Sequence, residues 1–239
     1  MRKIQTALKL IKTKHGIQLI FKYLLFKKYW DKKAKRVFLK SDIKDFWESS
    51  HKQKIQRWLT GSSLTQVKKT LDLSELIDTN YLIILEVGVG LGYCTRELSK
   101  NHEVDALDIS IKALKNVEKF CQQTYANSEK LQSNKYDLII VHLVIQHMSN
   151  ISLNNLLIDL VRSLKPNGLL AIQNIVKLDN YDYTDFDLSL EKEKAGNMVR
   201  SLKYMKEIIS ESGGTVKCSA YTNIYSAENV QNLILHVTK

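Results

Sequence analysis

A short run of glycines stands between two carboxylates near the middle of the 239-residue chain. The run reads Glu86-Val-Gly88-Val-Gly90-Leu-Gly92, and Asp108 lies 22 residues after Glu86. Glycines let the backbone turn tightly and lie against a ligand with no Cβ in between. A carboxylate has two acceptor oxygens, which suit the two hydroxyls of a ribose. The pattern therefore predicts a site for a nucleoside.

The elements around the glycine run predict how it is held. Apolar residues 82–85 predict a buried parallel strand, residues 93–100 have helical spacing, and residues 104–108 predict a second strand. A strand, a glycine loop and a helix in this order build a nucleotide crevice at the carboxyl ends of the strands in an open α/β sheet. A structural alternative stays open, in which Glu86 is a solvated strand end and Asp108 caps a helix from Ser110.

The glycine spacing distinguishes two kinds of nucleotide site. GxGxxG is typical of dinucleotide sites, whereas this chain has GxGxG with an acid two residues before the first glycine. The run resembles motif I of class I S-adenosylmethionine (SAM)-dependent methyltransferases. The resemblance implies SAM as cofactor, with Glu86 near its cationic methionine moiety and Asp108 on its ribose. It also places four neighbours among the cofactor-binding residues: Gly88, Gly90, Gly92 and Ile109.

The rest of the sequence predicts alternating strands and helices. The further strands are expected at residues 117–121, 136–141, 169–175, 216–221 and 233–237, and helices at 112–116, 153–164 and 202–212. The last two strands are close enough to pair as a hairpin. The total matches the seven-stranded, Rossmann-like α/β sheet of class I methyltransferases, mostly parallel with an antiparallel last strand. Residues 71–239 are expected to form this SAM-binding domain, and residues 1–70 a basic helical extension or lid.

Two histidines follow the predicted fourth strand, in Val141-His142-Leu-Val-Ile-Gln-His147-Met. Histidine suits proton removal from a hydroxyl, because its usual pKa of about 6.5 is near neutral. We expect His147 to be the general base, with His142 as second choice. The resemblance implies that His142 or Leu143 flanks the sulfonium of the cofactor and that Gln146 and His147 face the substrate. In the alternative, these histidines only bond backbone or pack against the cofactor.

Four other positions are candidates for contact with the cofactor or the substrate. Related methyltransferases place an acid after the third strand to bind adenine; the stretch 122–125 has none, so Thr124 is expected there instead. Tyr125 either stacks on adenine or belongs to the core. The resemblance implies that Trp58 covers the cofactor, and anchoring of its helix on the domain is the alternative. Arg200 is expected to hold a phosphate or carboxylate of the substrate, or else to be solvated.

No metal is expected. The histidines, five residues apart, are not a metal motif, and the three cysteines are widely spaced without a CxxC pair. Their small number fits a reducing cytoplasm. The segment 177–199 is expected to be a solvated loop or lid, although its acids are the richest source of metal ligands: Asp179, Asp182, Asp185 and Asp187.

The net charge of +11 is concentrated at one end. Residues 1–60 hold 17 Lys and Arg against 4 Asp and Glu, a net of +13, so the other 179 residues carry −2. Such a segment suits nucleic acid, an anionic membrane surface or a phosphorylated substrate. No stretch reaches the roughly 20 apolar residues that span a bilayer. A cytoplasmic protein is expected, with peripheral binding at the inner face of the membrane as an option.

A narrower resemblance rests on Trp58-Leu-Thr-Gly-Ser and on His142-Leu-Val-Ile-Gln-His147-Met. Both stretches are similar to small-molecule methyltransferases of bacterial surface-polysaccharide clusters. This implies methyl transfer to a hydroxyl, or as second choice an amine, of a sugar or glycan-linked small molecule. Two alternatives remain: an RNA-modifying enzyme that uses the basic segment, and a non-catalytic SAM-binding partner in a membrane-associated glycan-assembly complex. The first is disfavoured because residues 142–147 lack the Asn/Asp-Pro-Pro-Tyr/Phe pattern of base-nitrogen methylation.

Overall fold

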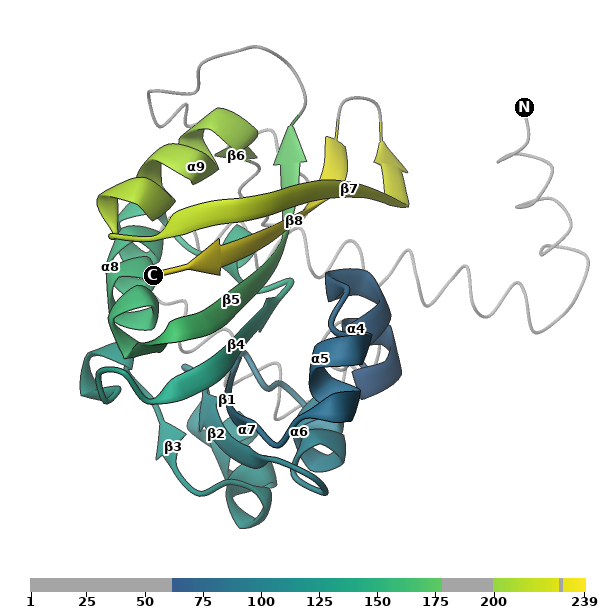
Figure 1. Cartoon of the computed structure of the whole chain (residues 1–239), viewed down its shortest axis with the longest axis vertical. Coiled ribbons are helices and arrows are strands. Elements are labelled where there is room, and N and C mark those ends of the chain that lie inside the picture. Colours follow the sequence, from purple (N-terminus) through teal and green to yellow (C-terminus); the bar gives the residue numbers. More distant parts are fainter. Residues whose placement is uncertain (1–61, 178–199, 228–229) are drawn as a thin grey trace, which may run out of the picture.

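The computed structural model describes residues 62–177, 200–227 and 230–239. They form a mixed β-sheet with helices on both faces (Figure 1). Strands lie in the order β3-β2-β1-β4-β5-β8-β7, and β6 pairs with β5 beside this path. The strands are β1 (Ile83–Val87), β2 (Glu103–Leu107), β3 (Thr124–Tyr125), β4 (Tyr136–His142), β5 (Leu164–Lys177), β6 (Arg200–Ser201), β7 (Thr215–Ala227) and β8 (Val230–Thr238).

The strand directions confirm the predicted sheet. All pairings among β1 to β6 are parallel, whereas β8 pairs antiparallel with both β5 and β7. Seven strands therefore form the main path, mostly parallel, with an antiparallel last strand in the chain. Because parallel strands end at the same edge, the carboxyl ends of β1, β2 and β4 meet there.

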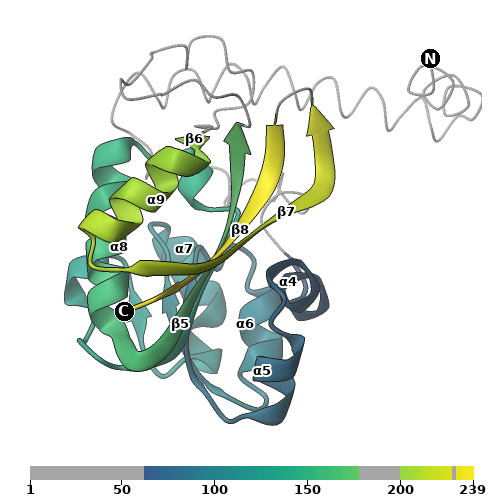
Figure 2. The same ribbon diagram turned by 45° about the horizontal axis from the view of Figure 1, so that its top comes forward.

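Helices cover both faces of the sheet (Figure 2). Successive side chains of a strand point to opposite faces, so Ile84 packs under one helical layer and Leu85 under the other. The first layer is α4 (Leu64–Leu71), α5 (Ser74–Thr79) and α6 (Tyr93–Leu98), and the second is α8 (Asn150–Ser163) and α9 (Leu202–Glu211). Helix α7 (Ile111–Val117) packs on Ala106 of β2. Strands buried on both faces explain the continuous apolar runs of the sequence.

Serine residues fix where four of these helices begin. In each case the hydroxyl of the capping serine accepts a hydrogen bond from the backbone amide three residues later. The caps are Ser63 of α4, Ser110 of α7, Ser149 of α8 and Ser201 of α9. Two of these helices start at the carboxyl edge of the sheet, so their caps also fix the backbone that leads away from the crevice strands β2 and β4.

One predicted strand is wrong. Residues 117–121, predicted as the third strand, are the end of α7 and a 3-10 turn at Glu118–Phe120, and the third strand is Thr124–Tyr125. The buried residues Ala113, Leu114 and Val117 follow helical spacing, so they continue the helix instead of starting a strand. The other predicted strands are present, although β5, β7 and β8 are longer than predicted.

The predicted N-terminal helices, Trp58 and the acidic segment after residue 177 lie outside the described residues. The expected domain boundary after residue 70 falls within α4, whose Val67 and Leu71 pack against the sheet. In the part of the chain that is described, no helix has the length and apolar character needed to cross a bilayer.

Candidate active site

The glycine loop follows β1 directly and has left-handed backbone at its three glycines. The φ angles of Gly88, Gly90 and Gly92 are +76°, +53° and +73°, a region that side chains disfavour. A Cβ on Gly88 would lie 2.3 Å from Cγ2 of Val144, and one on Gly92 would lie 2.2 Å from Cγ1 of Val117. The loop therefore needs glycine both for its turn and for its close packing.

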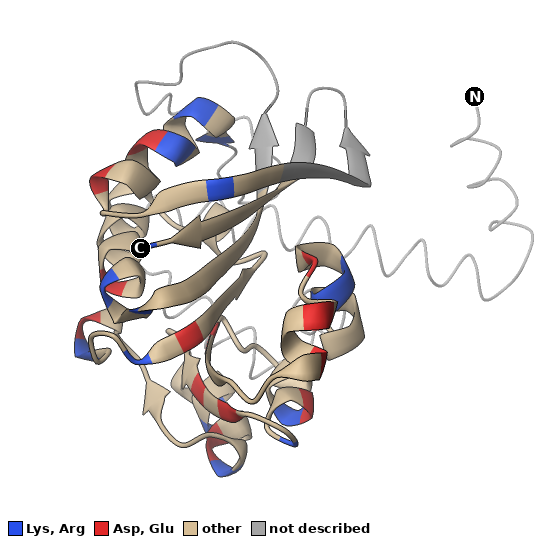
Figure 3. Cartoon of the chain, viewed as in Figure 1, with Lys and Arg blue, Asp and Glu red and all other residues tan. Residues whose placement is uncertain are grey.

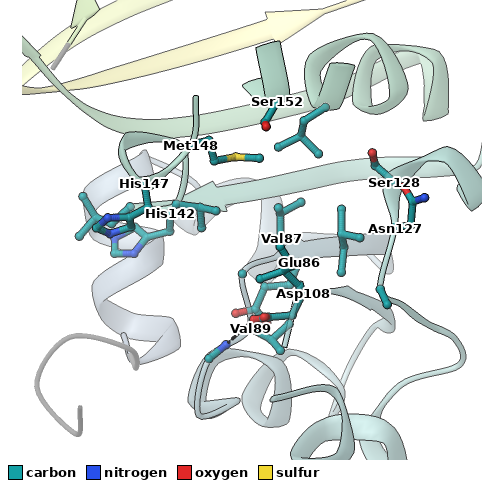
Figure 4. A pocket seen from close by; sticks show the side chains of 18 of the residues that line it. Glu86, Val87, Val89, Asp108, Asn127, Ser128, His142, His147, Met148 and Ser152 are labelled. Atoms are coloured by element: carbon teal, nitrogen blue, oxygen red, sulfur yellow. Dashed lines mark hydrogen bonds between the residues drawn. The ribbon is translucent and has the colours of Figure 1, made fainter. Parts of the chain in front are cut away.

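Asp108 stands beside this loop at the end of β2, and Figure 4 shows it below Glu86 and next to Val89. Its Oδ2 accepts a hydrogen bond from the amide of Gly90 at 3.2 Å, and its Oδ1 accepts one from the amide of Ser110 at 2.8 Å. The alternative in which Asp108 caps the next helix is therefore correct in part. Asp108 supports the start of α7, but the N-cap residue is Ser110. Asp108 also lines the crevice.

Glu86 is buried at the end of β1 and lines the same crevice. Its Oε2 accepts a hydrogen bond of 2.6 Å from the Thr95 hydroxyl on α6. Burial raises the pKa of Glu86 to about 7; the charge of Asp108 adds to this rise, while the Thr95 bond opposes it. A solvated strand end is thus excluded. A cation bound here would favour the carboxylate form of Glu86.

The crevice has a volume of about 370 Å³ and lies along the carboxyl ends of β1, β2 and β4. It brings together eight of the residues predicted from sequence: Glu86, Gly88, Gly90, Asp108, Ile109, His142, Leu143 and His147. Five other predicted residues do not line it: Gly92, Thr124, Tyr125, Gln146 and Arg200. Gly92 is instead the N-cap of α6.

Residues after β3 replace Thr124 and Tyr125 at the crevice. Thr124 is exposed away from it, and Tyr125 belongs to the main core cluster, which settles the choice between stacking and packing. The lining residues are instead those of 126–129, including Asn127, Ser128 and Glu129. The error follows from the misplaced third strand. Placing that strand at 124–125 would have pointed to Asn127, the first polar side chain after the strand that lines the crevice.

Helix α8 closes this end of the crevice. Its residues Ser152, Asn155, Leu156 and Asp159 line the wall. The Ser128 hydroxyl donates a hydrogen bond of 2.7 Å to Oδ2 of Asp159, which ties the loop after β3 to the helix. Nothing in the residue pattern indicates these contacts, because α8 has the pattern of an ordinary amphipathic helix.

The two histidines lie at the other end, side by side in Figure 4. His142 ends β4, and its Nδ1 lies 3.2 Å from the Ser62 hydroxyl. Its Nε2 is buried and has no hydrogen-bond partner among the described residues, and burial lowers the pKa of His142 to about 4. His142 is therefore neutral near pH 7 and a weak base. This leaves His147 as the stronger candidate for proton removal.

His147 sits in the 3-10 turn η3 (Ile145–His147) and lines the crevice. The preceding residue, Gln146, is buried rather than facing the crevice. Its Nε2 donates to the carbonyl oxygen of Leu143 at 2.7 Å and lies 3.4 Å from Nε2 of His147. Leu143 itself has a φ of +56°, a strained value for a leucine. Gln146 thus shapes the turn that carries His147.

Known proteins share this fold. Residues 85–172 match the family described as a methyltransferase domain. The 1,6-didemethyltoxoflavin-N1-methyltransferase of Burkholderia thailandensis is 14% identical, with a TM-score of 0.62 over 83% of this chain and 88% of that one. Magnesium protoporphyrin IX methyltransferase from Synechocystis PCC 6803 is 16% identical, with a TM-score of 0.60 over 84% of this chain and 99% of that one. This is the class I methyltransferase fold.

The fold does not by itself set the reaction. The cyclase SpnF has a TM-score of 0.57 and 13% identity over 75% of this chain and 83% of that one. No curated protein sequence matches the chain. The methyltransferase domain match and the shared fold with SAM-dependent methyltransferases together support SAM as the cofactor.

In this methyltransferase fold, Arg200 has a different place from the one expected. It is buried, 3% exposed, and its guanidinium donates hydrogen bonds to residues 145–150 rather than into the crevice. Arg200 is therefore not a solvated surface residue, and its guanidinium contacts the turn that carries His147. Sequence spacing offers no signal for such a contact between segments about 50 residues apart.

The charge of the crevice is negative along its described walls. The lining includes four carboxylates, Glu86, Asp108, Glu129 and Asp159, but no Lys or Arg among the described residues. Such walls suit a cationic ligand such as a sulfonium. Figure 3 shows acidic and basic residues both scattered over the described helices and strands. Within the described ranges, no three His, Cys, Asp or Glu side chains are grouped to hold a metal ion.

Proposed function

We propose that the protein transfers the methyl group of SAM to a hydroxyl, or as second choice an amine, of a sugar or glycan-linked small molecule. One observation carries the proposal. The glycine loop, held between Glu86 and Asp108, opens onto the same crevice as His142 and His147. A cofactor site and a candidate base thus share one cavity.

The cofactor has matching groups along the crevice. Asp108 would accept hydrogen bonds from the ribose hydroxyls, and Glu86 would lie on the side of the methionine moiety, where a positive charge favours its ionised form. Asn127, at the end where the loop after β3 meets α8, would offer its amide to the adenine. These three polar groups span the crevice from β1 to β3, as an adenosyl group requires.

Methyl transfer needs little further chemistry. The acceptor oxygen attacks the methyl carbon, the carbon–sulfur bond breaks with its electrons going to sulfur, and the hydroxyl proton passes to a base. His147 lines the crevice and is our candidate base. His142 is better suited to orient the acceptor as a neutral hydrogen-bonding group, because burial lowers its pKa to about 4.

The wall charges support a neutral acceptor group. The lining has no Lys or Arg among the described residues, so no described cation would pair with a phosphate or carboxylate on the acceptor. A hydroxyl or an amine needs no such cation to bind. The similar structures named above act on chemically different molecules, a toxoflavin precursor and a porphyrin. The sugar therefore rests on the resemblance of residues 58–62 and 142–148 to polysaccharide-cluster enzymes.

The proposal is tested with methyl-labelled SAM and separate pools of nucleotide sugars, glycans, RNA and protein. We expect label in a sugar or glycan pool, and loss of that label in the His147→Ala variant. Label only in RNA would replace the proposed substrate class with nucleic acid. Tight SAM binding with no label in any pool would support a non-catalytic partner instead.

A further inference from the structure

The side chain of Arg200 joins two segments that are far apart in the sequence. Its Nε donates to Oδ1 of Asn150 at 2.8 Å, its Nη1 donates to the carbonyl oxygen of Ile145 at 2.8 Å, and its Nη2 donates to the carbonyl oxygen of Met148. All three acceptors belong to residues 145–150. This stretch contains the turn η3 and the first residue of α8.

The backbone of Arg200 is itself held in place from two sides. Strand β6 pairs with the end of β5, with Arg200 opposite Val176. The next residue, Ser201, caps α9 by accepting the amide of Tyr204 at 3.1 Å. Helix α9 is anchored in the main core by Met205, Ile208 and Ile209. The backbone that carries the guanidinium is therefore held in a fixed position.

The turn that carries His147 is short. The amide of His147 donates to the carbonyl oxygen of Val144 at 3.0 Å, and the amide of Met148 donates to that of Ile145 at 3.2 Å. A single 3-10 turn of this kind is a poor structure alone. His147 and Met148 both line the crevice, so the direction of their side chains depends on the position of this turn.

We infer that Arg200 is a positioning residue, which fixes the backbone of residues 145–150 so that His147 and Met148 point into the acceptor end of the crevice. The inference rests on the proposed function only in naming that end. Arginine is required because its planar fork presents donors in several directions at once. A lysine keeps the charge but offers its donors from one atom, so it cannot serve three acceptors from residues 145, 148 and 150.

The test compares Arg200→Lys with the parent protein by ¹³C-methyl NMR of the methionines. The chain has four methionines, so the spectrum is sparse, and Met148→Leu assigns the signal of interest. Met205, buried on α9, reports whether the fold is intact. Arg162→Lys is the matched control, because Arg162 donates to the carbonyl oxygens of Glu129 and Leu131 in another loop.

We expect Arg200→Lys to shift or broaden the Met148 signal while Met205 stays sharp, and Arg162→Lys to leave Met148 unchanged. An unaltered Met148 signal in Arg200→Lys would overturn the inference. If Arg200→Lys also loses the Met205 signal and so fails to fold, Asn150→Ala decides. That variant removes one acceptor and leaves the arginine, and it should shift the Met148 signal from its position in the parent protein; no shift counts against the inference.

Kinetic and binding measurements distinguish a residue that positions the turn from one that only stabilises the fold. With the acceptor found by labelling, Arg200→Lys should lower kcat/KM about tenfold or more, because misaligned groups lose rate steeply, while SAM affinity stays close to that of the parent. An equal loss of SAM affinity and rate would point to general damage and overturn the inference. If the parent protein fails to bind SAM, the proposed function fails, but the ligand-free NMR comparison still tests Arg200.

Discussion

The backbone amide of Gly90 donates a hydrogen bond to Oδ2 of Asp108 at 3.2 Å, so the glycine loop is tied directly to the acid that follows β2. The other carboxylate oxygen accepts the amide of Ser110. One side chain therefore holds the loop, supports the start of α7 and faces the crevice. This arrangement explains why the acid and the glycines occur together in the sequence.

Replacing Asp108 with alanine should weaken SAM binding by about 1–3 kcal/mol, the usual cost of leaving buried polar groups unpaired. Calorimetric titration measures this change as a higher dissociation constant. Asp137→Ala is the matched control, because Asp137 accepts the amide of Ile83 at 2.9 Å at the opposite end of β1. It should lower stability without changing SAM affinity. Equal affinities for Asp108→Ala and the parent would contradict the ribose assignment.

Replacing Gly88 with alanine should destabilise the fold more than replacing Gly213. Both glycines have positive φ, +76° and +83°, so each alanine should cost roughly 1–2 kcal/mol of backbone strain. The new Cβ at Gly88 would also lie 2.3 Å from Cγ2 of Val144, whereas at Gly213 the nearest atom is 4.0 Å away. This overpacking adds about 1–3 kcal/mol.

Denaturant unfolding of the two glycine variants gives the comparison. Trimming the neighbour in the double variant Gly88→Ala with Val144→Ala should recover part of the loss, because it removes the clashing methyl group. Indistinguishable unfolding free energies for the two single variants would show that the glycine loop packs less closely than described.

His147→Ala should lower turnover at least about tenfold, with SAM affinity nearly unchanged, because a general base typically contributes about 10²–10⁴-fold. Initial rates on the acceptor identified by labelling, together with a SAM titration, measure both quantities. His142→Asn should behave differently and chiefly raise KM for the acceptor, since His142 is a weak base with a pKa lowered to about 4. Full turnover in His147→Ala would eliminate it as the base.

Glu86 should make stability depend on pH. Burial raises its pKa from 4.5 to about 7 in the folded protein, so the folded state binds this proton more tightly than the unfolded chain. The stability that Glu86 contributes is fully present below about pH 4.5 and is lost as pH rises through about 7. Glu86→Gln, which stays neutral, should therefore exceed the parent in unfolding free energy by about 3 kcal/mol at pH 8.

The difference between parent and Glu86→Gln, measured by denaturant unfolding from pH 4 to pH 8, isolates this group from the other titrating residues. It should be small at the acid end and grow with pH. A constant difference across the range would mean that Glu86 titrates at its ordinary pKa.

The parts of the site that sequence predicted are those fixed by short-range backbone geometry. Gly88 and Gly90 need positive φ, and Asp108 is bonded to the loop itself, so spacing alone located them. The prediction of the third strand was wrong because an apolar residue such as Val117 fits a strand or a helix equally well. In the structure Val117 ends α7, which packs on Ala106. That slip moved the predicted contacts from Asn127 to Thr124.

Arg200 illustrates what spacing cannot supply. Its partners Ile145, Met148 and Asn150 lie about 50 residues earlier, and they are two backbone carbonyls and one amide oxygen. Every residue has a backbone carbonyl, so residue types do not indicate such acceptors. From the sequence, a buried arginine of this kind is therefore predicted to be a surface or ligand-binding residue.

The most direct measurement is a calorimetric titration of the full chain with SAM. Saturable binding at one site is expected, and it should be weakened by Asp108→Ala but retained in Asp137→Ala. Absence of saturable heat at millimolar SAM, in protein shown to be folded, would contradict the assignment of the crevice between Glu86 and Asp108 as a cofactor site.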